Sequence, residues 1–284
     1  MRKSFILTLV AAVAALGFTA CNQDKPRQTK KITIGYVNWA EGIAMTQLAK
    51  NLLEKKGYTV VLKNADVAPI FAAVAGGDAD VFMDVWMPVT HKSYMETFGD
   101  RLTLLNTNFD AARIGLVVPD YVNIKTIDEL NAAKAKFGGN IVGIDAGAGI
   151  MSKAEDAVRE YNLDYQLQSS SEAAMLATLK KNIDEKMPVV VTGWAPHFMF
   201  SRYKLRFLED PKKVFGETEK IQTVANNEFS VRDTVAVNFF RKFKLNDEQL
   251  GALMGAIADA DGRENEAVET WIRENETLVQ SFGL

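Results

Sequence analysis

Two stretches of the chain share one pattern, an apolar strand that runs directly into Trp-x-Pro. The earlier copy is DVFMDVWMP, at residues 80–88, and the later copy is VVVTGWAPH, at residues 189–197. Short apolar runs that end at Gly or Pro predict buried strands. Because Trp86 and Trp194 are 108 residues apart, we expect two similar lobes. Each lobe would present a tryptophan at the carboxyl end of a strand, where open α/β sheets bind ligands.

Strands and helices alternate around this pattern. The predicted strands are 32–37, 58–63, 80–85, 102–106, 114–118, 141–145, 165–167, 189–192, 205–208 and 221–225. The predicted helices follow the first strand up to Gly57 and then cover 70–75, 127–137, 150–161, 171–183, 232–243, 246–260 and 264–281, with Ser171 and Asn246 as N-caps. Such alternation predicts parallel sheets with crossover helices.

The predicted elements divide the chain into two α/β lobes. Lobe 1 takes residues 32–110 plus 210–284, and lobe 2 takes residues 111–209. The segment 106–110, between two predicted strands, is the expected first crossing between the lobes. Two crossings form a hinge, so we expect a cleft that closes on a ligand.

Charge narrows the range of partners. The 284 residues carry a formal net charge of −3, with Lys and Arg interspersed among Asp and Glu. A phosphate backbone requires a basic patch or stripe. Nucleic acid is therefore not an expected partner.

The first residues have the form of a targeting segment. Arg2 and Lys3 precede an apolar stretch, 5–16, that is too short to span a bilayer. The only cysteine, Cys21, follows, and the arrangement resembles a bacterial lipoprotein signal. We expect residues 1–20 to be removed, Cys21 to be lipidated and residues 21–31 to form a tether; the alternative is an unmodified thiol. A lone cysteine leaves no disulfide and no thiolate zinc site.

Three of the four tryptophans lie where predicted parallel strands end. These are Trp39, Trp86 and Trp194, whereas Trp271 falls in a predicted helix and is expected to pack there. A single tryptophan is more often a core residue than a ligand contact. Three in equivalent loops of facing lobes favour a site for a quaternary ammonium ion, which aromatic faces hold. Carbohydrate stacking is the competing use of the same rings.

Donors for a ligand carboxylate are also available. Gly42 and Ile43 begin a predicted helix, whose first amides have no intrahelical partner, although Gly42 could equally serve a plain turn. His197, three residues after Trp194, could donate to a carboxylate, cap a helix or lie on the surface. His91 is interpreted as structural.

Motifs for cofactors and catalysis are missing from the sequence. The glycines of residues 143–149 match neither G-x-G-x-x-G nor the P-loop, so no cofactor is expected. Two histidines without cysteine partners do not assemble a metal site. Neither G-x-S-x-G nor H-E-x-x-H occurs, which argues against a lipid-anchored hydrolase. A sugar-binding or amino-acid-binding protein stays open as an alternative.

Four motifs together resemble one family, the glycine betaine/choline-type substrate-binding proteins of ABC importers. The motifs are VNWAEGIA (37–44), DVWMPVTH (84–91), GIDAGAGIM (143–151) and TGWAPH (192–197). The resemblance implies a two-lobed periplasmic-binding-protein fold of type II. It also implies an extracytoplasmic, lipid-anchored protein of the cell envelope, a monomer that passes its ligand to a membrane permease and touches the membrane only through the anchor.

The resemblance further implies a set of site residues. The implied tryptophan cage is Trp39, Trp86 and Trp194, and the implied carboxylate contacts are the Gly42 and Ile43 amides and His197. Glycine betaine is the expected ligand, with choline, carnitine or another betaine as alternatives. This preference requires Glu41 to face outward or to be paired, because a free carboxylate in the cleft would repel a betaine.

Overall fold

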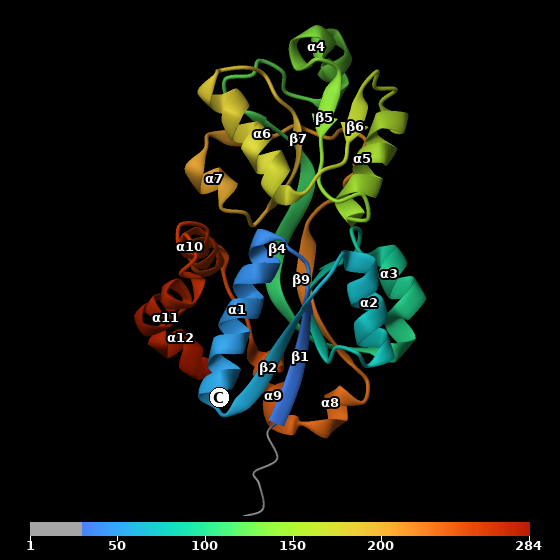
Figure 1. Cartoon of the computed structure of the whole chain (residues 1–284). Helices are drawn as coiled ribbons and strands as arrows, with labels where there is room; N and C mark the ends of the chain where they lie inside the picture. The colour runs from blue at the N-terminus through green and yellow to red at the C-terminus, as the bar shows by residue number, and fades with distance from the viewer. Residues whose placement is uncertain (1–29) are drawn as a thin grey trace, which may run out of the picture.

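One long strand, β4 (Leu102–Pro119), runs through both halves of the molecule (Figure 1). The computed structural model describes residues 30–284. Through Ala112, β4 pairs with a strand of lobe 1, and from Arg113 it pairs with strands of lobe 2. The expectation of two strands separated by a crossing at 106–110 was wrong. Irregularities in the pairing, of the kind made by β-bulges, bend a single strand from one lobe into the other.

Lobe 1 contains a sheet in the order β2-β1-β3-β9-β4. Strands β1, β2 and β3 are parallel, and β9 is antiparallel to β3 and β4. The bounds are β1 (Lys30–Tyr36), β2 (Tyr58–Asn64), β3 (Val81–Met87) and β9 (Glu219–Asn226). The predictions for these four strands are confirmed, to within two residues at either end.

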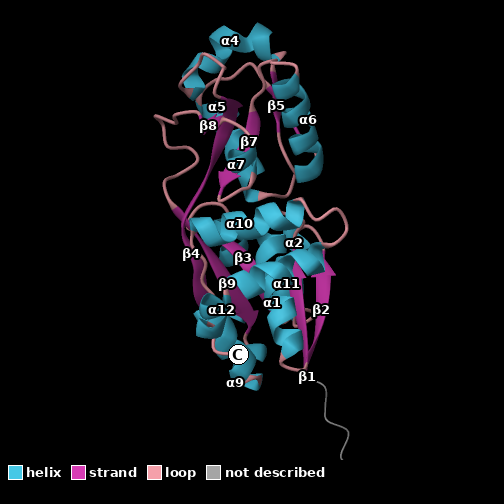
Figure 2. Cartoon of the chain, turned by 90° about the vertical axis from the view of Figure 1, so that its left-hand side faces the viewer, coloured by secondary structure: helices cyan, strands magenta, loops and turns pink. Residues whose placement is uncertain are grey.

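Helices flank this sheet on both sides (Figures 1 and 2). Helix α1 packs against α10 and α11, and α2 packs against α3. The bounds are α1 (Ala40–Lys55), α2 (Val67–Gly76), α3 (Lys92–Phe98), a 3-10 turn (Gly99–Arg101), α8 (Phe229–Arg232), α9 (Thr234–Lys242), α10 (Asp247–Ala258), α11 (Glu264–Glu274) and α12 (Glu276–Ser281). The helix predicted at 264–281 is interrupted at Asn275, whose backbone leaves the helical region.

Lobe 2 repeats the arrangement in a smaller form. Its strands follow the order β4-β7-β5-β6, with β8 paired to β4, and β5 is parallel to β6 and β7. The bounds are a 3-10 turn (Ile127–Glu129), α4 (Leu130–Phe137), β5 (Asn140–Val142), α5 (Gly149–Glu160), β6 (Gln166–Gln168), α6 (Glu172–Asp184), β7 (Val191–Ala195), α7 (Met199–Arg202) and β8 (Leu205–Phe207). Ser171 accepts from the Ala174 amide at 3.2 Å, which confirms the predicted N-cap of α6.

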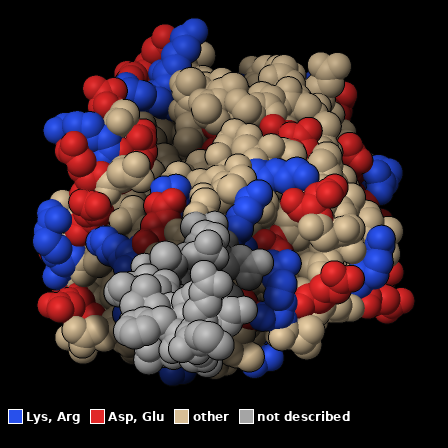
Figure 3. All heavy atoms as spheres, turned by 60° about the horizontal axis from the view of Figure 1, so that its bottom comes forward, with Lys and Arg blue, Asp and Glu red and all other residues tan. Residues whose placement is uncertain are grey.

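The expected two-lobed α/β fold is thus confirmed, whereas the lobe limits at 110/111 and 209/210 stay a prediction. The change of partners at Ala112 and Arg113 falls beside the first limit, and the chain returns to lobe 1 between β8 and β9. At the foot of lobe 1, the described residues show basic and acidic side chains interspersed (Figure 3). No helix within residues 30–284 has the length and apolar character needed to cross a bilayer.

We expect Asn246→Ala to lower the free energy of unfolding by about 1 kcal/mol. Asn246 and Gln249 form a capping box at the start of α10, with 2.9 Å bonds in both directions. Urea unfolding would measure the change. The control is Asn123→Ala: Asn123 is exposed, its side chain bonds to no described residue, and a change of more than ~0.5 kcal/mol there would contradict the cap as the cause.

Candidate functional site

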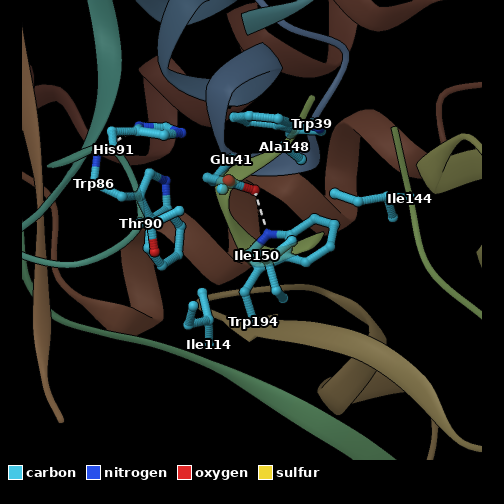
Figure 4. Close-up of a pocket in the computed structure, with 11 residues that line it drawn as sticks. Trp39, Glu41, Trp86, Thr90, His91, Ile114, Ile144, Ala148, Ile150 and Trp194 are labelled. Atoms are coloured by element: carbon cyan, nitrogen blue, oxygen red, sulfur yellow. Dashed lines mark hydrogen bonds between the residues drawn. The ribbon is translucent and has the colours of Figure 1, made fainter. Parts of the chain in front are cut away.

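Three tryptophans from distant parts of the chain line one cavity (Figure 4). Trp39 precedes α1, Trp86 and Trp194 are the last residues but one of β3 and β7, and each is at most 5% exposed. The space among the lining side chains, together with the part of it that opens to solvent, is about 280 Å³. The strand ends therefore bring these rings together, as the sequence predicted. Their role as a cage around a ligand stays a prediction.

Both lobes contribute to the cavity wall. The other lining residues are Glu41, Thr90 and His91 from lobe 1 and Ile114, Ile144, Ala148, Gly149 and Ile150 from lobe 2. Aliphatic side chains thus complete the wall that the aromatic rings begin. The cavity exists because the lobes meet around it.

Each of the three indole N–H groups points to a carboxylate. Trp86 Nε1 donates to Asp84 Oδ1 at 2.8 Å, within β3. Trp194 Nε1 donates to Glu41 Oε2 at 2.8 Å, from lobe 2 to lobe 1. Trp39 Nε1 donates to Asp145 Oδ2 at 3.4 Å, from lobe 1 to lobe 2. Buried indoles require such acceptors, so these bonds fix the planes of the rings.

Two of these carboxyl groups are buried without a countercharge. Glu41 and Asp84 are each 1% exposed, and neither forms an ion pair within residues 30–284. Burial raises the pKa of Asp84 to about 7. Burial, with Asp84 and Glu172 as like charges nearby, also raises the pKa of Glu41 well above its ordinary value. In the described residues, no three His, Cys, Asp or Glu side chains are grouped to hold a metal ion.

The N-terminus of α1, predicted to hold a ligand carboxylate, already faces carboxylates of the protein. The Ile43 amide donates to Trp39 O at 2.8 Å, so it closes the first helical turn. A Cβ on Gly42 would lie 2.6 Å from Asp84 Oδ2, so that carboxylate occupies the space beside this turn. Gly42 and Ile43 do not line the cavity. Their expected contact with a ligand stays a prediction.

His197 also has other partners. Its Nδ1 accepts from the Met199 amide at 3.0 Å, and its Nε2 lies 3.2 Å from Glu172 Oε1. The first bond places the ring proton on Nε2, which donates to Glu172. His197 does not line the tryptophan cavity but a neighbouring pocket, and its ring lies edge-on to that of Trp194, with centroids 4.8 Å apart. Its expected contact with a ligand carboxylate stays a prediction.

His91, interpreted from the sequence as structural, lines the cavity instead. Its Nδ1 accepts from the Trp86 amide at 3.0 Å, so its proton lies on Nε2. That Nε2 is buried and has no hydrogen-bond partner among the described residues. Burial lowers the pKa of His91 to about 3, which keeps the ring neutral near pH 7. The ring also stacks on Trp39, with centroids 5.8 Å apart.

The N-terminus of α5 lines the cavity beside His91. Gly149 and Ile150 are the first two helical residues after the N-cap Ala148. The first amides of a helix have no intrahelical partner and carry the positive end of its dipole. The loop 146–149 was set aside in the sequence because it is no nucleotide motif. This loop follows a predicted strand and leads into a predicted helix, and that position was the signal in the sequence for an anion site.

Direct contacts hold the two lobes in a closed arrangement. Glu172, the first residue of α6, accepts from the Ala40 amide at 3.1 Å and so caps α1 of the opposite lobe. Tyr94 donates its hydroxyl to Gly147 O at 2.8 Å across the cleft. Gly149 lies so close to Thr90 that a Cβ would be 2.0 Å from the Thr90 carbonyl oxygen.

We expect Gly149→Ala to prevent full closure. The added methyl group would require the lobes to separate by roughly 1.5 Å at Thr90, since carbon and oxygen pack at about 3.5 Å. Alanine suits a helix, so the variant should keep its stability. Small-angle X-ray scattering would detect the larger radius of gyration. Gly147→Ala is the control, because its Cβ would meet only Tyr94 Oη, at 3.9 Å; equal expansion of both variants would contradict the role of Gly149.

Comparison with known proteins shows the family. A model described as the substrate binding domain of ABC-type glycine betaine transport systems matches residues 30–274. The glycine betaine/carnitine transport binding protein of Listeria monocytogenes is 42% identical over 145 residues, which cover 50% of this chain and 48% of that protein. The aligned part thus spans about half the length of this curated relative.

Two solved structures are similar over nearly the whole described chain. Lactococcal OpuAC in its closed form with glycine betaine is 32% identical, with a TM-score of 0.84, and the match covers 89% of this chain and 99% of that one. The glycine betaine/L-proline-binding protein ProX of Borrelia burgdorferi is 32% identical, with a TM-score of 0.86, and the match covers 89% and 96%. The chain therefore belongs to the family of substrate-binding domains of ABC-type glycine betaine transport systems.

Proposed function

We propose that this protein binds a quaternary ammonium solute, glycine betaine above all, between its lobes and delivers it to the permease of an ABC importer. The observation that carries the proposal is the cavity lining, which combines three indoles with neutral hydrogen-bond donors. A trimethylammonium group has no N–H to donate, so ring faces hold it by electrostatic attraction and close packing. His91 Nε2–H and the first amides of α5 would receive the carboxylate.

The relatives support this choice of ligand. The Listeria protein is named for glycine betaine and carnitine, and the lactococcal structure contains glycine betaine. Members of the family are transport proteins rather than enzymes. Substrate-binding proteins of ABC importers act outside the cytoplasm. We extend this to a monomer anchored through a lipid on Cys21, which lies outside the described residues.

Choline is the second candidate, because Glu41 lies on the cavity wall. Glu41 is paired with the Trp194 indole, as the preference for betaine required, yet it still faces the ligand space. An ionised Glu41 would favour a ligand of net positive charge. A protonated Glu41, which burial and the nearby carboxylates favour, would tolerate the carboxylate of a betaine.

Isothermal titration calorimetry with glycine betaine, choline, carnitine and a panel of sugars tests the proposal. We expect binding of at least one quaternary ammonium compound and none of the sugars. Sugar binding without any binding of quaternary ammonium compounds would overturn it.

Aromatic faces should account for cation binding. We expect Trp194→Leu to lose about 0.5–2 kcal/mol more binding free energy for glycine betaine than Trp194→Phe, because only Phe retains a ring face. Titration of both variants gives the difference. Trp271→Phe is the control, since Trp271 is buried in α11 away from the cavity. Equal losses for Phe and Leu would indicate packing alone.

His91 should separate betaine from choline. His91→Asn keeps an acceptor near Nδ1 for the Trp86 amide and removes the Nε2–H donor. Hydrogen bonds to charged groups contribute about 1.5–3 kcal/mol, so glycine betaine affinity should fall roughly 10- to 100-fold and choline affinity less than about threefold. Because His91 stays neutral above its pKa of about 3, its contribution should be constant between about pH 6 and 8. An equal loss for both ligands would contradict the donor role.

A further inference from the structure

Asp84 is a buried charge that the contacts with a ligand do not explain. It lies on β3 two residues before Trp86, and it does not line the cavity. Its Oδ1 accepts from the Trp86 indole at 2.8 Å, whereas its Oδ2 has no hydrogen-bond partner among the described residues. A buried carboxylate with one oxygen unpaired is costly unless something compensates its charge.

The groups that face Asp84 are mostly acidic or neutral. Glu41 on α1 and Glu172 on α6 are the nearby carboxylates. Glu172 is itself bonded to His197, and His91 is a neutral ring. Asp84 forms no ion pair with any described Lys or Arg, and the partial positive charge beside it is the first turn of α1 at Gly42.

The tryptophan cavity is where a compensating cation would lie. The indole of Trp86 forms part of its wall, and the N–H edge of that indole is bonded to Asp84. A cation against the ring face would therefore have the carboxylate beyond the N–H edge of the same ring, at a distance set by the size of one indole. In the low dielectric of a closed site, attraction over such a distance is substantial.

We propose that Asp84 is a specificity-determining positioning residue, which holds the Trp86 indole and makes the cage prefer a cation to a neutral molecule of the same shape. The inference rests on the proposed function and extends it to a residue that does not touch the ligand. A role in fixing the ring alone would affect charged and neutral ligands equally. A role of the Asp84 charge would change the affinity for the cation only.

The test compares choline with 3,3-dimethylbutan-1-ol, in which carbon replaces the nitrogen and the shape is kept. Asp84→Asn retains an oxygen to accept from Trp86 Nε1 and removes the charge. At pH 8.5 we expect the variant to bind choline roughly tenfold more weakly, from a Coulomb term at an effective dielectric near 20 and partial compensation. Its affinity for the neutral alcohol should change less than twofold.

The affinity for choline should depend on pH with a definite sign. The ionised carboxylate favours the cation, so wild-type affinity for choline should rise with pH through the Asp84 pKa of about 7 and level off above it. The affinity for the neutral alcohol should not rise. The Asp84→Asn variant should lose the part of this rise that Asp84 contributes.

Asp145→Asn is the matched control. Asp145 also accepts from a cage indole, at 3.4 Å, but it is partly exposed to solvent, which screens its charge. We expect less than a threefold loss of choline affinity there. Equal losses of choline and the alcohol in Asp84→Asn, no loss of either, or an effect no larger than that of Asp145→Asn would overturn this inference alone. A wild-type protein that binds no quaternary ammonium compound would overturn the proposed function and this inference with it.

Discussion

The hydrogen bonds between indole N–H groups and carboxylates are the interaction on which the site depends. Two of the three cross the cleft, from Trp39 to Asp145 and from Trp194 to Glu41. In an open arrangement these indoles and carboxylates would be hydrated separately. Closure therefore does two things at once, because it satisfies the polar edges of the rings and encloses the space between their faces. Formation of the site and movement of the lobes are one event.

Closure also concentrates negative charge. Glu41, Asp84 and Glu172 come from three elements of both lobes and are buried together. Their mutual repulsion and loss of hydration oppose the closed state when the cavity holds no cation. A ligand with a positive head offsets that cost only in the closed state, where Glu41 lies on the cavity wall and Asp84 lies at the edge of a wall indole. Such a difference in interaction between two states is what a ligand needs in order to shift their populations.

Much of the fold could be predicted because its signals are local. The apolar strands before Trp-x-Pro and the caps Ser171 and Asn246 depend on residues adjacent in the sequence. The continuity of β4 could not be predicted, since the polar residues at 106–110 resemble a loop until β9 pairs with them. Pairing between distant strands decides such segments.

The sequence could not decide between two possible sets of carboxylate donors, for a related reason. Helices α1 and α5 both begin after a strand end, and both start with a glycine near their first turn, so the sequence offers two equivalent anion sites. Glu172 distinguishes them, because it caps α1 from a position 132 residues away. The two histidines show the same limit of sequence reasoning, because the partners of each ring come from distant residues or from the folded backbone. His197 is nearer in sequence to its tryptophan, yet its Nε2 is bonded to Glu172, whereas the Nε2 of His91 is left beside the cavity.

The position of Asp84 at the N–H edge of Trp86 resolves a conflict between the two ends of a betaine. A carboxylate in direct contact with the ligand attracts the ammonium group and repels the ligand's own carboxylate when that end swings toward it. At the N–H edge of an indole and off the cavity wall, the same charge attracts the cation without direct contact with either end of the ligand. The neutral state of His91 fits this arrangement, because an imidazolium in the same cavity would repel the cation that the carboxylates attract. Charge is thus kept at the periphery, and the surfaces facing the ligand are rings and neutral donors, with Glu41 the one ionisable acid on the described wall.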